Sequence, residues 1–275
     1  RSSCAISYSA TLPCISSLRG WGEEAGFQKR EGKNMKRQDG RRRDQLRSIS
    51  FTTDFIEYPE GSVLISTGKT KVLCNVSIEE DVPGWMERNE IGGGWVTAEY
   101  AMLPRSTHTR RSRETDGLGG RTQEIRRLIG RSLRAAVNLK KLGPRTCIVD
   151  CDVLQADGGT RTASITGGYV ALALALQRLI REGSLTPDVF APPVAAVSVG
   201  VIREGPVLDL CYEEDSKAEV DLNVVMNANQ RYIEIQGTAE GNPFSQRTLD
   251  SLLELANQGI EELISVQRRT LDQST

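Results

Sequence analysis

Short apolar, β-branched stretches alternate along the chain with longer amphipathic ones, and this alternation begins near residue 49. The runs Ser62–Ser66 and Lys71–Ser77 are separated by only four residues, Thr-Gly-Lys-Thr. This spacing predicts a β-hairpin whose turn needs a positive φ at Gly68. Similar runs predict further strands over Ile49–Ile56, Trp95–Leu103, Thr146–Leu154, Val194–Ile202, Val207–Tyr212, Leu222–Met226 and Tyr232–Gly237.

Three longer segments have the apolar spacing of a helix. Thr122–Leu142 has apolar residues at positions i, i+3 and i+4 with arginines and lysines between them, and Gly143-Pro144 follows as a stop signal. Thr162–Ile180 is apolar on nearly every side, which predicts a buried helix, and Ser245–Val266 is amphipathic. Strands come before and between these helices, an order typical of an α+β fold with mixed sheets and packed helices.

Residues 1–34 follow neither pattern. The first twenty residues contain six serines and two arginines but no acidic residue. Such a composition is typical of a transit peptide, and equally of an upstream stretch that the native protein lacks. The ordered pattern begins after Met35, so we expect residues 1–34 to be an extension that is disordered or not native. Residues 35–275 then form a single domain of ordinary size.

Composition and charge narrow the classes of function. The 35 basic and 36 acidic residues leave a net charge of −1, which excludes a globally basic nucleic-acid-coating protein but not a local basic patch. No apolar run reaches the roughly 18 residues of a membrane span. The six cysteines form no CxxC pair and the single histidine is His108, so we expect neither a structural zinc site nor a histidine-dependent triad. This cysteine usage is typical of a reducing compartment, and we expect a cytoplasmic protein without membrane contact.

The segment Pro104–Arg121 concentrates positive charge in a chain of almost no net charge. It is too long and irregular for a simple turn, and its only acidic residues are Glu114 and Asp116. Arginine suits phosphate recognition better than lysine does, so the segment predicts RNA contact, with a solvated surface loop as the alternative. The arginines are Arg105, Arg110, Arg111, Arg113 and Arg121.

A second feature is the sequence Asp157-Gly158-Gly159-Thr160-Arg161, which links a predicted strand to the buried helix. Glycines let the backbone approach a ligand closely, and the free amides at a helix N-terminus attract anions. Thr160 adds a hydroxyl and Arg161 adds a bidentate cation. The pattern predicts an anion pocket, and a tight turn with a helix-capping threonine is the alternative.

Residues 213–221 carry five carboxylates in nine positions, beside two predicted strands. Like charges this close must be solvated, spread apart or bridged by a cation. Mg²⁺ typically takes one or two carboxylates plus substrate phosphate oxygens, so the segment fits a magnesium site as well as an acidic hairpin turn. Together with the arginine-rich segment and the anion pocket, it indicates phosphoryl transfer on RNA.

Along with these features, the chain carries longer strings that resemble the ribonuclease PH family of phosphate-dependent tRNA 3′-exonucleases, and the resemblance runs from Met35 to about Leu271. It implies one α+β domain, related to the core exosome subunits, in a hexameric ring built as a trimer of dimers. The matching stretches are Lys71–Cys74, Leu103–Arg110, Gly119–Thr122, Asp150–Thr162 and Ile235–Gly241.

The activity that the resemblance implies is phosphorolysis. Inorganic phosphate attacks the 3′-terminal phosphodiester of tRNA precursors and other structured RNAs and releases a nucleoside diphosphate, and the reverse reaction adds nucleotides. Which aspartate donates the proton to the leaving oxygen stays open. The implied residues are Arg121, Gly159, Thr160 and Arg161 for phosphate, Asp215 and Asp221 for catalysis and Mg²⁺, and Arg105, Arg110 and Arg113 for tRNA.

Two other functions compete with this one. An exosome-type ring subunit could bind RNA without catalysis, but the presence of both phosphate-binding arginines and both aspartates argues against it. A hydrolytic nuclease would use water instead of phosphate, which leaves the anion pocket without a purpose.

Overall fold

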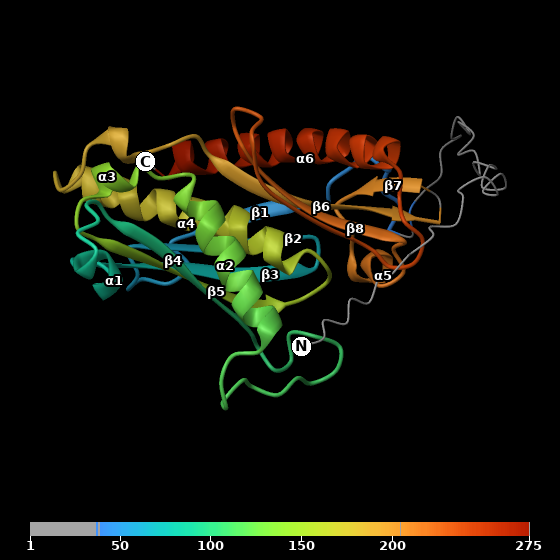
Figure 1. Ribbon diagram of the computed structural model, residues 1–275, viewed down its shortest axis with the longest axis horizontal. Helices are drawn as coiled ribbons and strands as arrows, with labels where there is room; N and C mark the ends of the chain where they lie inside the picture. Colours follow the sequence, from blue (N-terminus) through green and yellow to red (C-terminus); the bar gives the residue numbers. More distant parts are fainter. Residues whose placement is uncertain (1–36, 38, 204, 275) are drawn as a thin grey trace, which may run out of the picture. The chain divides into compact units, whose positions relative to one another are not determined.

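The computed structural model describes residues 37, 39–203 and 205–274, and Figure 1 shows the path of the chain. The expectation of an extension over residues 1–34 falls outside the described residues. From residue 39 onward, strands and helices follow each other in the order that the hydrophobic pattern predicts, with the exceptions given below.

The first sheet has the strand order β1-β2-β3-β5-β4, and only the pairing of β4 with β5 is parallel. Its strands are β1 (Ile49–Thr53), β2 (Gly61–Thr67), β3 (Thr70–Glu79), β4 (Trp95–Met102) and β5 (Thr146–Gln155). Side chains alternate between its two faces, so Val72, Cys74 and Val76 of β3 share one face and are 0% exposed. Gly68 has φ of 56° in the turn between β2 and β3, which confirms the predicted hairpin.

The second sheet has the order β7-β6-β8-β9 and is antiparallel throughout. Its strands are β6 (Val194–Ile202), β7 (Gly205–Leu208), β8 (Val220–Asn227) and β9 (Tyr232–Ala239). The central strand β6 is buried along almost its whole length because helices pack on it.

Three long helices complete the core: α2 (Gly120–Arg134), α4 (Thr160–Arg181) and α6 (Gln246–Gln273). Helix α4 packs on β2 and β3 of the first sheet and on β6 of the second, so it joins the two sheets (Figure 1). A Cβ at Gly167 would lie 2.6 Å from Ile65 Cγ2, which shows how closely α4 approaches β2. Helix α4 is long and apolar enough to cross a membrane, but 83% of its apolar window is buried in this core, as predicted.

The α+β fold with mixed sheets is confirmed, but the helix predicted over Thr122–Leu142 is wrong in its second half. Helix α2 ends at Arg134, and only the short helix α3 (Leu139–Leu142) follows. Between them Val137 forms a β-bridge with Phe190, and the amide of Asn138 donates to Val189 O at 2.8 Å. These tertiary hydrogen bonds take the place of helical ones, although the apolar spacing continues through the break.

A short helix that the hydrophobic pattern did not predict, α1 (Gly84–Arg88), lies between β3 and β4. One further prediction is corrected. The strand predicted over Val207–Tyr212 stops at Leu208, because Asp209 adopts a left-handed φ of 56° and the chain turns into the short helix α5 (Tyr212–Asp215). The first three carboxylates of the acidic segment therefore lie on helix α5 rather than in a hairpin turn.

Candidate functional site

The predicted anion pocket begins with a sharp turn after β5. Gly158 and Gly159 have φ of 74° and 64°, a region that L side chains rarely adopt. A Cβ at Gly158 would lie 2.7 Å from Leu210 O, so the loop presses against the backbone that follows β7. The turn releases the chain directly into α4, whose first residue is Thr160.

The first turn of α4 presents its amides together with two predicted phosphate ligands. The Thr160 side chain is buried and shares a hydrogen bond of 2.9 Å with Tyr100 Oη. The Arg161 guanidinium donates from Nη1 to Gln236 Oε1 at 3.0 Å and to Glu124 Oε1 at 3.3 Å. Both side chains are therefore held in place at a helix N-terminus, where partial positive charge favours an anion.

Arg121 enters the same space from the first turn of α2. Its side chain is exposed, and within the described part of the chain it makes no hydrogen bond or ion pair. Burial raises the pKa of Tyr100, while the Thr160 hydrogen bond and then the charges of Arg121 and Arg161 act to lower it. Both guanidinium groups thus act on the Tyr100 hydroxyl, beneath the anion pocket.

The two predicted catalytic aspartates also lie within reach of these arginines. Asp215 ends α5 and Asp221 lies on β8. Burial, and then the charge of Asp215, raise the pKa of Asp221 to about 6, although Arg161 acts to lower it. Burial likewise raises the pKa of Asp215, while Arg121 and Arg161 act to lower it. The exposed Asp215 and the partly buried Asp221 therefore form an acidic centre on which two cations act.

The acidic centre has features that a divalent cation requires. Asp221 Oδ1 is buried and has no hydrogen-bond partner among the described residues, so it is free to coordinate an ion. The described residues contain no group of three or more metal-ligating side chains. Two carboxylates suit Mg²⁺, which usually completes its shell with water and substrate phosphate oxygens. The donor set therefore fits Mg²⁺ bound together with a phosphate-containing ligand.

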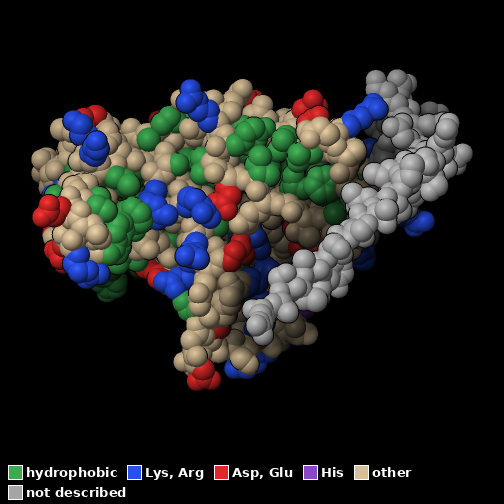
Figure 2. All heavy atoms as spheres, in the orientation of Figure 1, with side chains coloured by type: hydrophobic (Ala, Val, Ile, Leu, Met, Phe, Trp, Pro, Cys, Tyr) green, Lys and Arg blue, Asp and Glu red, His purple; other side chains and the backbone are tan. Residues whose placement is uncertain are grey.

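The arginine-rich segment forms a long loop between β4 and α2, without helix or strand over residues 103–119. It projects from the lower edge of the molecule in Figure 1, and basic side chains lie beside it in Figure 2. Arg105, Arg110 and Arg113 are exposed on it and make no ion pair with any described residue. The His108 ring lies 6.0 Å from the Tyr212 ring, so the loop reaches the helix that carries Asp215.

The structure thus brings the predicted phosphate ligands and the two aspartates together, with the three predicted tRNA-binding arginines on the neighbouring loop. Sequence reasoning missed Tyr100, Gln236 and Glu240. Tyr100 shares a hydrogen bond with Thr160, and Gln236 accepts one from Arg161. Glu240 helps to raise the pKa of Asp221, although burial and the charge of Asp215 have larger effects. Gln236 and Glu240 lie in a stretch that matches the family, and Tyr100 occupies an inward position of a predicted strand. Neither the family match nor the inward strand position predicts which residue each of the three side chains contacts.

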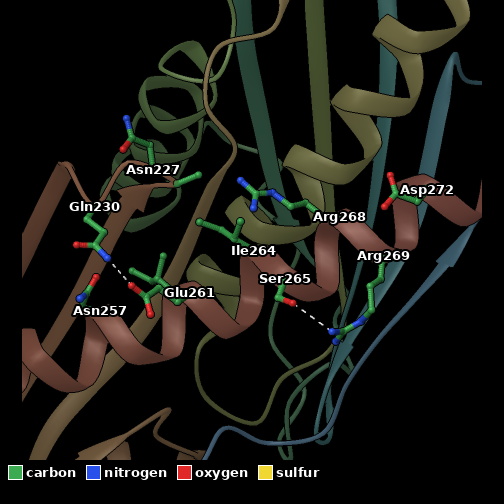
Figure 3. Close-up of a pocket in the computed structure, with 11 residues that line it drawn as sticks. Asn227, Gln230, Asn257, Glu261, Ile264, Ser265, Arg268, Arg269 and Asp272 are labelled. Carbon is green, nitrogen blue, oxygen red and sulfur yellow. Dashed lines mark hydrogen bonds between the residues drawn. The ribbon is translucent and has the colours of Figure 1, made fainter.

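A separate groove lies between the β8–β9 turn and α6 (Figure 3), with a volume of about 300 Å³. Gln230 donates to Glu261 across it, and Arg269 donates to Ser265 Oγ at 3.1 Å. None of the predicted site residues lines this groove.

Comparisons with known proteins match this chain along most of its length. Residues 45–176 match the model of the 3′ exoribonuclease family, domain 1, and residues 192–259 match domain 2. The ribonuclease PH of Bacillus subtilis is 54% identical over 241 residues, which cover 86% of this chain and 98% of that protein. The ribonuclease PH of Crocosphaera subtropica is 55% identical over 238 residues, 86% of this chain and 98% of that protein.

Solved structures show the same fold at greater distance. The Archaeoglobus fulgidus exosome with RNA bound to the active site superposes with a TM-score of 0.67 at 21% identity. The superposition covers 87% of this chain and 93% of that one.

Proposed function

Because the chain belongs to the ribonuclease PH family of 3′ exoribonucleases, we infer that it is a phosphorolytic 3′-to-5′ exoribonuclease. It trims the 3′ ends of tRNA precursors, uses inorganic phosphate as a substrate and releases nucleoside diphosphates. As a nucleotidyltransferase it also runs the reverse reaction, which adds nucleotides from diphosphates.

The observation that carries this conclusion is the meeting of two kinds of charge. Arg161 in the first turn of α4 and Arg121 in the first turn of α2 both act electrostatically on the carboxyls of Asp215 and Asp221. Orthophosphate and an RNA phosphate repel each other, so a phosphorolytic site needs cations around both of them. A hydrolytic nuclease has no need of the anion pocket.

The residues divide the reaction between them. Arg121, Gly159, Thr160 and Arg161 bind the attacking phosphate, whose oxygen forms a bond to the terminal phosphorus of the RNA. The bond from that phosphorus to the 3′ oxygen of the preceding nucleotide breaks, and this oxygen takes up a proton. We assign the proton to one carboxyl of the Asp215–Asp221 pair, because burial raises the pKa of both groups. The protein otherwise acts by positioning the reactants.

We assign a Mg²⁺ ion to Asp215 and Asp221 on the basis of the buried, unpartnered Asp221 Oδ1. When bound, the ion neutralises charge on the scissile phosphate and the leaving oxygen. Asp221→Asn keeps the shape but removes one charge from this centre. We expect a large fall in turnover that high Mg²⁺ partly relieves, with tRNA affinity nearly unchanged.

We assign the tRNA body to Arg105, Arg110 and Arg113, since these exposed guanidinium groups lie on the loop that reaches α5. We further propose a cytoplasmic homohexamer, a trimer of dimers, as in the family that the sequence resembles. Sedimentation tests the assembly: full tRNA trimming by a 30 kDa monomer at micromolar concentration would contradict it. An RNA-binding ring subunit without catalysis is disfavoured, because this site retains two cations facing two carboxylates.

One assay tests the function itself. The protein is incubated with 3′-extended tRNA and Mg²⁺, with and without inorganic phosphate, and the released nucleotides are identified. We expect nucleoside diphosphates only when phosphate is present. Monophosphates released without phosphate would identify a hydrolase, and bound but intact tRNA would identify a silent RNA-binding subunit.

A further inference from the structure

The segment before β1 contains three arginines that are almost completely buried. Arg37, Arg41 and Arg47 are 7%, 8% and 7% exposed, and none of them belongs to the predicted site. Arginine is rarely buried unless it is paired. Arg37 pairs with Glu214 and Arg47 pairs with Asp209, two buried acidic residues on the segment that leads to the catalytic centre. Arg41 pairs with Asp39 at 2.7 Å and lies 3.5 Å from Asp209.

Arg47 connects the segment after β7 to the phosphate-binding loop. The Asp209 carboxylate accepts from Arg47 Nη2 at 2.6 Å, from Nε at 3.0 Å and from the backbone amide of Arg47 at 2.8 Å. The remaining nitrogen, Nη1, donates to the carbonyl oxygen of Asp157 at 2.6 Å. One guanidinium therefore spans from a buried carboxylate to the backbone that leads into Gly159.

Arg37 makes the corresponding connection to the carboxylate-bearing helix. Its Nε donates to Glu214 Oε1 at 2.6 Å, and its Nη2 donates to Glu214 Oε2 as well. Its Nη1 donates to Leu208 O at 2.6 Å. Glu214 immediately precedes Asp215 on α5, so Arg37 holds this helix to the end of β7.

The two connected parts touch each other directly. The Tyr212 amide donates to Asp157 Oδ1 at 3.4 Å, and a Cβ at Gly158 would lie 2.9 Å from Tyr212 N. The anion loop therefore packs on the start of α5 without space between them. A small shift of either part changes the distance between the bound phosphate and Asp215, and errors of about 1 Å in an active site can cost two orders of magnitude in rate.

We propose that Arg37 and Arg47 are positioning residues of the phosphorolytic site: Arg47 sets the phosphate-binding loop, and Arg37 sets the helix that carries Asp215. This proposal rests on the function proposed above. Both residues are buried and hydrogen-bonded to the groups that they hold, so they act through those groups. Stability alone does not account for the arrangement, since buried ion pairs contribute little compared with well-packed apolar residues.

The test replaces each arginine by lysine, which keeps the charge. The single nitrogen of a lysine at position 47 cannot span Asp209 and the Asp157 carbonyl as the guanidinium does. We expect Arg47→Lys to raise the KM for phosphate and the phosphate Kd about tenfold, the effect of losing one charge-assisted hydrogen bond, with tRNA affinity unchanged. Arg37→Lys should instead lower kcat about tenfold and change the phosphate KM less, because it acts through Asp215.

The matched control is Arg42→Lys in the same segment, whose exposed side chain pairs with Asp44 at 3.0 Å. It should leave kcat and both KM values unchanged. Urea unfolding establishes that each variant is folded under the assay conditions, and calorimetry measures phosphate binding apart from turnover. If Arg47→Lys folds less stably but binds phosphate like the wild type, the role of Arg47 is structural and the proposal is wrong.

The two hypotheses can fail separately. A wild-type protein that binds phosphate but releases no diphosphate would refute the proposed function, while the calorimetric comparison would still decide the role of Arg47. Folded lysine variants with unchanged phosphate binding, KM and kcat would refute the positioning role, whatever the wild type does.

Discussion

Two arginine-rich segments of this protein differ in the burial and in the ion pairing of their arginines. In the segment 37–47, Arg37, Arg41 and Arg47 are buried and paired with Asp209 and Glu214. In the loop 103–119, all four arginines are exposed and none forms an ion pair with a described residue. The number of positive charges in a segment therefore does not show whether those charges are accessible to a ligand.

The difference follows from where the negative partner comes from. A buried guanidinium needs its carboxylate inside the protein, and once paired its hydrogen-bond donors are not available to an RNA. An exposed guanidinium keeps its hydration until a phosphate releases the counterions around both groups. The arginines of segment 37–47 thus hold parts of the protein together, whereas those of the loop 103–119 are accessible to a phosphate ligand.

The largest expected effect is on stability and comes from breaking the buried ion pair of Arg37 with Glu214. Arg37→Ala leaves the Glu214 carboxylate without its bidentate partner and should lower the free energy of unfolding by about 3–5 kcal/mol. Arg113→Ala, the exposed counterpart, should change it by less than about 0.5 kcal/mol. Urea denaturation of both variants measures the difference. Equal and small effects would mean that the buried segment contributes no more to folding than the loop does.

A second prediction concerns Arg161, whose side chain is 18% exposed and is thus intermediate between the buried and the exposed arginines. Arg161→Lys keeps the charge but loses the fork that can grip one phosphate with two hydrogen bonds. We expect the phosphate concentration for half-maximal rate to rise about tenfold to a hundredfold, since such bonds contribute roughly 1.5–3 kcal/mol. Initial rates against phosphate at saturating tRNA measure it. An unchanged phosphate curve with weakened tRNA binding would assign Arg161 to RNA.

The third prediction concerns the exposed loop. Replacing Arg105, Arg110 and Arg113 together by alanine should weaken tRNA binding about tenfold and leave urea unfolding unchanged. The slope of log affinity against log salt should become shallower by about 0.7–0.9 for each RNA phosphate that the variant no longer neutralises. Titrations at several salt concentrations measure the slope, and a very short oligonucleotide serves as the control substrate. Equal reductions on long and short substrates would place these arginines in the reaction centre instead.

The smallest expected effect is the pH dependence of stability that the buried segment produces. Burial acts to raise the pKa of Asp209, but Arg47 and then Arg41 outweigh it and hold this pKa below its usual value. A lowered pKa in the folded state contributes stability above the unfolded value of about 3.9, and this contribution is lost as pH falls through the folded pKa.

Asp209→Asn should therefore be less stable than the wild type at pH 7 and lose less stability between about pH 4 and pH 2. Glu114→Gln in the exposed loop is the control and should follow the wild type. Thermal unfolding across this pH range measures both curves. Parallel curves for wild type and Asp209→Asn would show that the ion pair with Arg47 does not lower the pKa of Asp209.

The sequence by itself determined most of the long helices and strands of this protein and the chemistry of its charged segments. Strand periodicity, the glycine turn at residues 158–159 and the apolar buried helix are local properties, so they could be read from neighbouring residues. The arginine-rich loop, the anion turn and the acidic segment also identified phosphoryl transfer, because each residue type carries its charge wherever the chain folds.

Only the tertiary structure decided which charges meet. Arg37 and Arg47 find their carboxylates 177 and 162 residues away, a separation at which periodicity carries no information. The same holds for the end of α2 at Arg134, where hydrogen bonds to residues 189–191 override a continuing helical pattern. It holds for the left-handed turn at Asp209, where β7 ends and the chain leads into α5. Local pattern specifies what each residue can do, whereas its partner depends on how distant segments pack.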